Sequence, residues 1–203
     1  MSKKVLDEPR LVRAARADVS FALSFCARPS GVERAAFSLK QSSCPHCGCV
    51  GTLNRHSHSL GNDPAVADGQ IIRGQRVFCS NRGQRGGCGR TFLLCLAEVL
   101  PRHTLTASLV WQWLLKLLSG LSIKAAVEKL RLPFALETFY RLRCKLRQRL
   151  DGLRTRLYGE PSPPASRHPD PLLQTVEHLQ AAFPRNECPP VDFQLHFQHP
   201  FLG

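Results

Sequence analysis

The chain has 203 residues, is 43% hydrophobic and carries 28 Lys and Arg against 15 Asp and Glu, which gives a net charge of +13. This apolar content is sufficient for a folded core, and the positive charge favours polyanionic partners, nucleic acid first. The first ten residues lack a hydrophobic segment of signal-peptide length, and the most apolar run, residues 105–118, is too short and too polar to span a bilayer. We therefore expect neither a secreted nor a membrane-spanning protein.

Residues 1–43 are predicted to form an N-terminal arm, to which the sequence assigns no function. Apolar positions around residues 11–25 show a weak helical pattern. Residues 50–58 and 70–78 are typical of strands, and the sequence between them is rich in the turn-forming residues Gly, Asn, Asp and Pro. With residues 91–95 they predict a small three-stranded sheet.

Cysteine spacing predicts a metal site within residues 44–100. Cys44 and Cys47 form a Cys-x2-Cys turn, which presents two thiolates in the geometry of a tetrahedral zinc ion. Cys79 and Cys88 are separated by eight residues rich in Gly and Arg, which can loop out and return Cys88 to the metal. We predict a zinc ribbon that holds one Zn²⁺ through these four cysteines.

Three further residues compete for this site. Cys49, Cys95 or His46 could replace one of the four ligands, or the thiols could be buried without a metal. The zinc is expected to be structural, because no His-x-Glu or His-Glu-x-x-His sequence accompanies the cysteines to supply an open coordination position and a general base.

Residues 101–158 change to a helical hydrophobic period. Apolar side chains in residues 105–119 cover more than one face, which predicts a core helix or half of a dimer interface. Ser122 is placed to cap a second helix, and Pro133 then enforces a break because the residue before proline avoids helical geometry. A third and longer helix is expected over residues 135–158.

The second and third of these helices have the proportions of a helix-turn-helix, in which the later helix enters the major groove. Its early turns would face base edges, and its later basic side chains suit phosphate contacts, as do arginines near the second pair of cysteines. The alternative is a basic, solvated helix whose leucine stripe packs on the bundle or forms a short coiled coil in a homodimer. The predicted DNA-contacting residues are Arg82, Arg85, Arg90, Glu137, Thr138, Tyr140, Arg141, Arg143, Lys145 and Arg147.

Residues 159–203 are predicted to form a linker and a C-terminal tail. The linker is rich in proline, and the rest is expected to be mostly irregular, with one short helical stretch near residues 172–183. The last residues, 191–203, hold more aromatic and aliphatic side chains than a spacer requires. Packing back onto their own domain is the favoured explanation, and the alternative is an anchor for a transposase or another partner protein.

A family resemblance rests on two segments, Arg73-Gly-Gln-Arg-Val-Phe-Cys79-Ser-Asn-Arg82 and Gly87-Cys-Gly-Arg-Thr-Phe92. They resemble the zinc ribbons at the amino ends of bacterial insertion-sequence transposases and their accessory proteins, in which such a ribbon precedes a helix-turn-helix. Those ribbons more usually have a close second pair of cysteines, in contrast to the eight-residue spacing here. The resemblance implies a bacterial, cytoplasmic and nucleoid-associated protein of a mobile genetic element.

The sequence thus predicts an α+β chain in which a zinc-ribbon module precedes an all-α helix-turn-helix module and a Pro-rich tail. Only 45 residues follow Tyr158, which leaves no room for a transposase catalytic domain. We expect an accessory or regulatory protein that binds double-stranded DNA and is not an enzyme. The alternatives are a dimeric transcriptional repressor and a protein-interaction adaptor that does not bind DNA.

Overall fold

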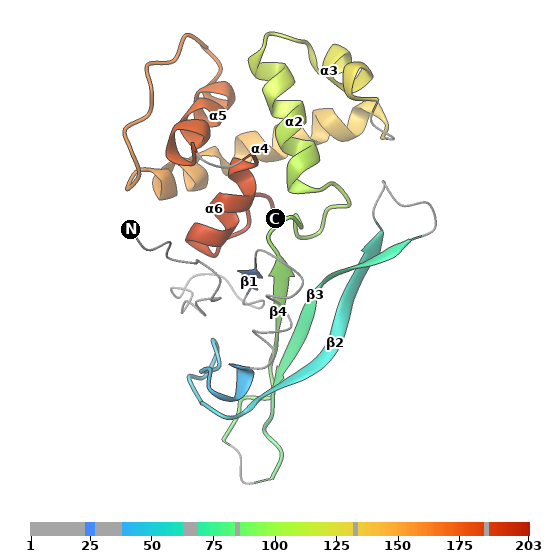
Figure 1. Cartoon of the computed structure of the whole chain (residues 1–203), viewed down its shortest axis with the longest axis vertical. Helices are drawn as coiled ribbons and strands as arrows, with labels where there is room; N and C mark the ends of the chain where they lie inside the picture. The colour runs from blue at the N-terminus through green and yellow to red at the C-terminus, as the bar shows by residue number, and fades with distance from the viewer. Residues whose placement is uncertain (1–22, 27–37, 63–68, 84–85, 132–133, 185–186) are drawn as a thin grey trace. The chain divides into compact units, whose positions relative to one another are not determined.

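The structure is a computed structural model that describes residues 23–26, 38–62, 69–83, 86–131, 134–184 and 187–203. The chain divides into two compact units, Met1–Val99 and Leu100–Gly203, which we call the sheet unit and the helical unit. The described strands all lie in the sheet unit and the described α-helices all lie in the helical unit (Figure 1). The α+β class expected from the sequence is therefore confirmed.

The sheet unit contains one four-stranded sheet with the order β1-β4-β3-β2. Antiparallel pairing joins β2 to β3 and β3 to β4, whereas β1 runs parallel to β4. A short 3-10 helix, η1, precedes β2. The elements are β1 (Leu23–Cys26), η1 (Ser38–Lys40), β2 (Leu53–Asn62), β3 (Gln70–Cys79) and β4 (Thr91–Leu96).

A small apolar core forms on this sheet. Leu53, Val77, Phe92 and Leu94 are all buried, and they come from three neighbouring strands. Gly74 lets β3 and β4 approach closely, because a Cβ at this position would overlap the carbonyl oxygen of Leu94. The three expected strands are confirmed, with bounds that differ by a few residues.

The fourth strand corrects the expectation of a helical pattern up to residue 25. Phe25 and Cys26 belong to β1, where Phe25 pairs with Cys95 of β4 and is 1% exposed. Burial against a distant strand outweighs a weak local helical period, because β-pairing depends on tertiary contacts that the local sequence does not encode. The rest of the predicted arm helix lies outside the described residues.

The helical unit contains five described α-helices. Their starts follow from capping side chains: the Thr106 hydroxyl accepts a hydrogen bond from Leu109 N, the Ser122 hydroxyl accepts one from Ala125 N, and the Asp170 carboxylate accepts one from Leu172 N. The cap predicted at Ser122 is thus confirmed. The helices are α2 (Ala107–Leu118), α3 (Ile123–Leu130), α4 (Leu136–Leu157), α5 (Pro171–Ala182) and α6 (Pro189–Phe197).

The core of the helical unit is built around α2. Trp113 is fully buried, and its ring packs against Phe139 of α4 with centroids 5.4 Å apart. The leucine stripe of α4, which was considered for a coiled coil, is buried in this same core. The stripe therefore packs on the bundle, as one of the two alternatives expected. The stripe residues are Phe139, Leu142, Leu146, Leu150, Leu153 and Leu157.

Residues 159–203 differ from the mostly irregular tail that the sequence suggested. The helical stretch predicted near residues 172–183 is α5, and α6 adds a second helix, with Phe193 and Phe201 fully buried. Two prolines at the first turn of α6 lack only N–H groups that would have no partner within a helix, so they start the helix instead of preventing it. The buried Gln194 side chain accepts a hydrogen bond from Phe201 N at 3.0 Å. The favoured expectation that the last residues pack on their own domain is confirmed.

Candidate metal centre and basic helix surface

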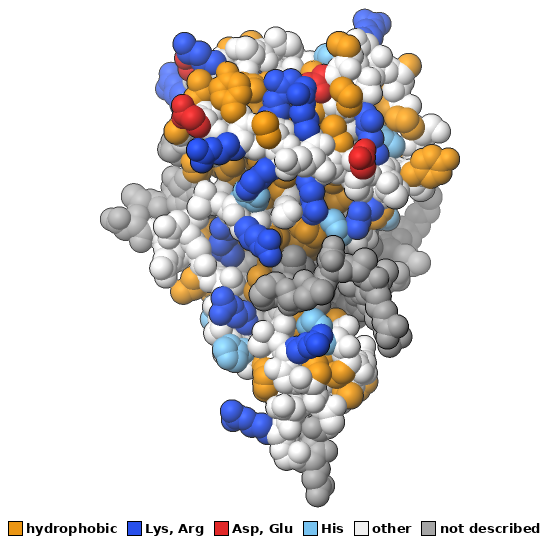
Figure 2. All heavy atoms as spheres, turned by 180° about the vertical axis from the view of Figure 1, so that it is seen from behind, with side chains coloured by type: hydrophobic (Ala, Val, Ile, Leu, Met, Phe, Trp, Pro, Cys, Tyr) orange, Lys and Arg blue, Asp and Glu red, His pale blue; other side chains and the backbone are white. Residues whose placement is uncertain are grey.

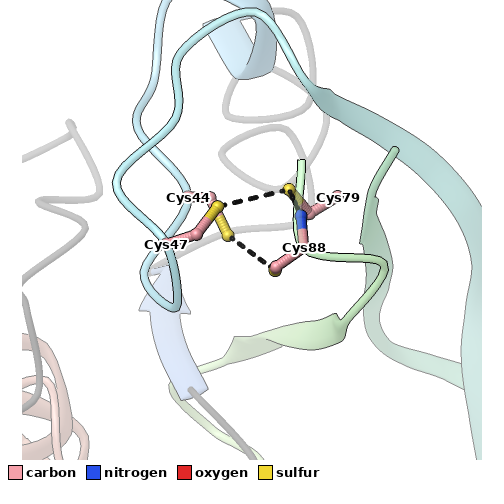
Figure 3. Close-up of side chains that lie close together, drawn as sticks. All are labelled: Cys44, Cys47, Cys79 and Cys88. Carbon is pink, nitrogen blue, oxygen red and sulfur yellow. Dashed lines mark hydrogen bonds between the residues drawn. The ribbon is translucent and has the colours of Figure 1, made fainter. Parts of the chain in front are cut away.

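Four cysteine side chains converge in the sheet unit (Figure 3). The Sγ atoms of Cys44, Cys47, Cys79 and Cys88 all lie within 4.8 Å of one another. The Sγ atoms of Cys44 and Cys88 are 3.8 Å apart, as are those of Cys47 and Cys79. Four sulfurs placed tetrahedrally at about 2.3 Å from one ion are about 3.8 Å apart. The cluster therefore has the size required to hold a metal ion.

The first pair sits on a tight turn that follows η1. Gly48 N donates a hydrogen bond to Cys44 O at 2.8 Å, and Cys44 N donates one to Cys49 O at 2.9 Å. Gly48 adopts a φ of 76°, a left-handed conformation that glycine reaches without steric cost. The backbone N–H of His46 also points at the Cys44 sulfur, at 3.4 Å. This turn presents both sulfurs to the same point.

Cys79 and Cys88, the second pair of cysteines, lie close together although eight residues separate them in the sequence. Cys79 ends β3, and Cys88 returns to it because Cys88 N donates to the Cys79 sulfur at 3.3 Å and Gly89 N donates to Cys79 O at 3.0 Å. Gly87 passes so close to the chain that a Cβ there would overlap Ser80 O. The two ends of this segment, as far as the structure describes it, therefore bring Cys88 back to Cys79, as the sequence predicted.

The local environment of the sulfurs differs from one ligand to the next. A backbone hydrogen bond from Cys49 is the main cause that lowers the pKa of exposed Cys47 to about 6, whereas burial raises the pKa of Cys44 to about 12. The Thr52 hydroxyl lies 3.2 Å from the Cys79 sulfur, a contact that no sequence motif indicated. Because metals bind thiolates, one ligand is largely ionised at neutral pH and buried Cys44 must release a proton on binding.

The competing ligands are not members of this four-cysteine cluster, although Cys49 lies beside it and interacts with Cys47. Cys49 donates through its sulfur to Gly86 O at 3.0 Å, and Cys95 is buried within β4. His46 keeps its Nε2 atom buried without a hydrogen-bond partner. Within the described part of the chain, the cluster that could hold a metal ion consists of the four predicted cysteines alone.

Most predicted DNA-contacting residues of α4 lie on its exposed side. Glu137, Tyr140, Arg141 and Lys145 are exposed, and Thr138 is half-buried. Tyr140 is a large aromatic side chain that is 51% exposed. These residues share the first turns of the helix, at spacings that place Glu137, Arg141 and Lys145 on adjacent turns of one side.

Two other predicted contacts of α4 are used within the protein. Arg143 and Arg147 each donate through Nη2 to Asp170 Oδ2, at 2.8 and 2.9 Å. Asp170 is also the N-cap of α5, so these ion pairs fasten α5 to α4. We therefore assign both arginines to the α4–α5 contact, a pairing across more than 20 residues that sequence spacing could not indicate.

Three of the predicted DNA-contacting residues belong to the sheet unit. Arg82 lies within the loop that joins Cys79 to Cys88, Arg90 follows this loop, and both are exposed. The backbone N–H of Arg82 donates to the Ser80 hydroxyl at 3.4 Å. Arg85 lies outside the described residues.

We expect Asp170→Asn to lower the free energy of unfolding of the helical unit by about 1 to 2 kcal/mol at about pH 7, because Asn keeps the cap but removes the charge that pairs with two arginines. Burial raises the pKa of Asp170, but hydrogen bonds from Arg143, Leu172 N and Arg147 outweigh it and leave the pKa lowered. The charge therefore stabilises the fold above about pH 4 and ceases to do so as the pH falls through the lowered pKa. Urea denaturation from about pH 7 to about pH 2 should show the two stabilities converging in acid, and a constant difference would contradict the assignment.

Comparisons with known proteins place no constraint on the site. No protein-family model, curated protein or solved structure matches the chain. Among the helices that the structure describes, none combines the length and apolar character needed to cross a membrane. The four-cysteine cluster, which could hold a metal ion, and the exposed side of α4 are therefore the features on which the functional argument depends.

Proposed function

We propose that the protein is a zinc-stabilised DNA-binding protein that engages duplex DNA through α3 and α4 as a helix-turn-helix. The observation that carries this proposal is the exposed, basic side of the first turns of α4. In this proposal it acts as an accessory or regulatory protein of a mobile genetic element, in the bacterial cytoplasm, and it binds DNA without catalysing a reaction.

The choice of zinc rests on the chemistry of the four ligands. Four thiolates at tetrahedral spacing suit Zn²⁺, which has no redox chemistry and commonly occupies sites made of four cysteines. The protein supplies all four ligands, so no position is left for a substrate or a water. Such a site would be structural, and it gives the sheet unit the fold of a zinc ribbon.

The helix-turn-helix assignment rests on geometry and charge. α3 ends at Leu130, its C-cap Arg131 adopts a left-handed φ of 48°, and a short connection leads to α4. α4 carries seven Lys and Arg against two acidic residues. Figure 2 shows Lys and Arg side chains distributed over the helical unit, with few Asp and Glu on the face in view. In this arrangement Tyr140, Arg141 and Lys145 would meet the major groove and its phosphates.

The adaptor alternative has lost its main support. It relied on an apolar helix around Trp111 and Trp113 that would be free to assemble a larger complex, but these side chains are 3% and 0% exposed in the core of their own unit. The leucine stripe of α4 is likewise covered, so a homodimer would need another surface. A dimeric repressor remains compatible with the proposed DNA contacts.

The proposed function predicts one zinc per chain and DNA binding that weakens steeply with salt. Each neutralised phosphate adds about 0.9 to the slope of log K against log salt, so three basic contacts would give a slope of at least about 2.7 in magnitude. Metal analysis and fluorescence anisotropy with a random-sequence duplex across a salt series measure both. One zinc without DNA binding at low salt would reject the proposal in favour of the adaptor.

A further inference from the structure

A small cavity lies in the helical unit beside the middle of α4. Its volume is about 220 Å³, and its wall is formed by the loop before α2, by α4 and by the end of the chain. Three of its residues, Lys145, Gln148 and Arg149, occupy adjacent turns of one side of α4. The lining residues are Arg102, His103, Lys145, Gln148, Arg149, Leu202 and Gly203.

The lining of this cavity is strongly cationic. Arg102, Lys145 and Arg149 carry three positive charges, and none of the seven lining residues has a carboxylate side chain. Arg149 is directed at this wall, since a Cβ on Gly203 would lie 3.9 Å from its Nη2 atom. No carboxylate side chain among the described lining residues compensates these three charges, which favours the binding of an anion.

The backbone at Arg102 is held in an unusual conformation. Its φ of 63° lies in the left-handed region, which residues other than glycine seldom adopt. The turn is closed by a hydrogen bond from His103 N to Leu100 O at 3.1 Å. Arg102 is exposed and lines the cavity, in a backbone conformation that Gly would adopt with less strain.

His199 and Arg156 are two further titratable groups that are influenced by the charge of Arg149. Burial, together with the charges of Arg156 and Arg149, lowers the pKa of His199 to about 4. Arg156 has a lowered pKa as well, because of burial and of the charge of Arg149. The positive charges of these basic groups disfavour a further positive charge nearby, and for the same electrostatic reason they favour a bound anion.

We propose that this cavity binds a phosphate group and, resting here on the proposed function, that it holds a backbone phosphate of the bound DNA. The planar guanidinium groups of Arg102 and Arg149 provide paired donors for phosphate oxygens, Lys145 supplies a point charge and Gln148 an amide donor. Lys145 belongs both to the cavity and to the exposed side of α4, so a phosphate held here would fix α4 against the DNA backbone.

Two variants test the phosphate site directly. Arg102→Gly removes a charge and should fold at least as well, because Gly adopts the observed φ without strain, and Arg149→Gln removes a second charge. Inorganic phosphate at constant ionic strength should raise the Tm of the wild-type helical unit by about 3 °C and that of the double variant by much less. Arg167→Gln, which changes an exposed arginine of the linker, is the matched control and should respond as the wild type does.

Measuring duplex binding by the same proteins distinguishes a site for a DNA backbone phosphate from a site for free phosphate. The double variant should lose about 0.9 from the salt slope and about tenfold in affinity at low salt, while Arg167→Gln loses neither. A Tm response to phosphate with no change in DNA binding would assign the cavity to free phosphate. If phosphate does not change the Tm and the double variant binds DNA as the wild type does, the phosphate site is refuted. The proposed function is unaffected by that result. A protein that responds to phosphate but binds no DNA would reject the proposed function alone.

Discussion

Removal of the metal is expected to unfold the sheet unit while the helical unit stays folded. The core of the sheet unit is small, and Cys44 and Cys79 are themselves part of it. Structural zinc contributes an apparent free energy of about 10 to 16 kcal/mol in zinc-finger peptides, which is as large as the whole stability of many domains. The helical unit has a separate and much larger core, which contains no cysteine of the cluster.

Cys79→Ser tests this expectation in the full chain. The variant should bind less than about 0.1 zinc per chain and should lose amide protection in β2, β3 and β4, while protection in α2 and α4 is retained. Hydrogen exchange with mass spectrometry measures both units at once. Cys49→Ser is the control, because Cys49 neighbours the cluster without belonging to it, and the zinc content of this variant should not change. Full zinc content in the Cys79 variant, or its loss in the Cys49 variant, would show that the ligand set is wrong.

Reversal of charge on the exposed side of α4 should abolish DNA binding without unfolding the protein. Arg141→Glu combined with Lys145→Glu changes two exposed side chains for which the described part of the chain shows no hydrogen bond or ion pair. Replacing each attraction to phosphate by a repulsion should lower affinity at least about 100-fold and lower the salt slope by about 1.8. Circular dichroism should be unchanged, since both residues lie outside the buried stripe.

A substitution of an arginine that pairs with Asp170 should have the opposite effect to the charge reversal, lowering stability more than DNA binding. Arg147→Gln should cost stability through the lost ion pair but should reduce DNA affinity less than threefold, about 0.6 kcal/mol, because this side chain already binds Asp170. Anisotropy and urea denaturation of the same samples distinguish the two effects. Strong DNA binding by the charge-reversed protein would refute the assignment of α4 to the major groove.

Much of the secondary structure follows from local sequence. The strand and helix periods, the cap at Ser122 and the break before α4 could all be predicted, because they depend on residues within one or two turns of each other. The cysteine ligands could be proposed for a similar reason, since a Cys-x2-Cys turn and a Gly-rich loop have few geometries that suit a tetrahedral ion. The strands, the cap and the convergence of the four cysteines are confirmed by the structure, and metal binding by these cysteines stays a prediction.

The features that sequence reasoning missed depend on residues far apart in the chain. β1 exists because Phe25 pairs with Cys95, and Arg143 finds Asp170 across 27 positions. The cationic cavity combines residues near positions 102, 145 and 203. No periodicity links such positions, so only the fold reveals them. The start of α6 was missed for another reason, because two consecutive prolines are compatible with a helix only in its first turn, and the local sequence does not show that a helix begins there.

The route by which Cys88 reaches the cluster bears on how such centres are found. Its position is set by its own N–H bond to the Cys79 sulfur, by the Gly89 N–H bond to Cys79 O and by the close passage of Gly87 past Ser80. All of these contacts lie at the two ends of the loop. They therefore place no restriction on the number of residues between those ends. Pattern searches that require a fixed gap between the third and fourth cysteines will overlook centres of this kind, whereas a search for an N–H group directed at the earlier sulfur would find them.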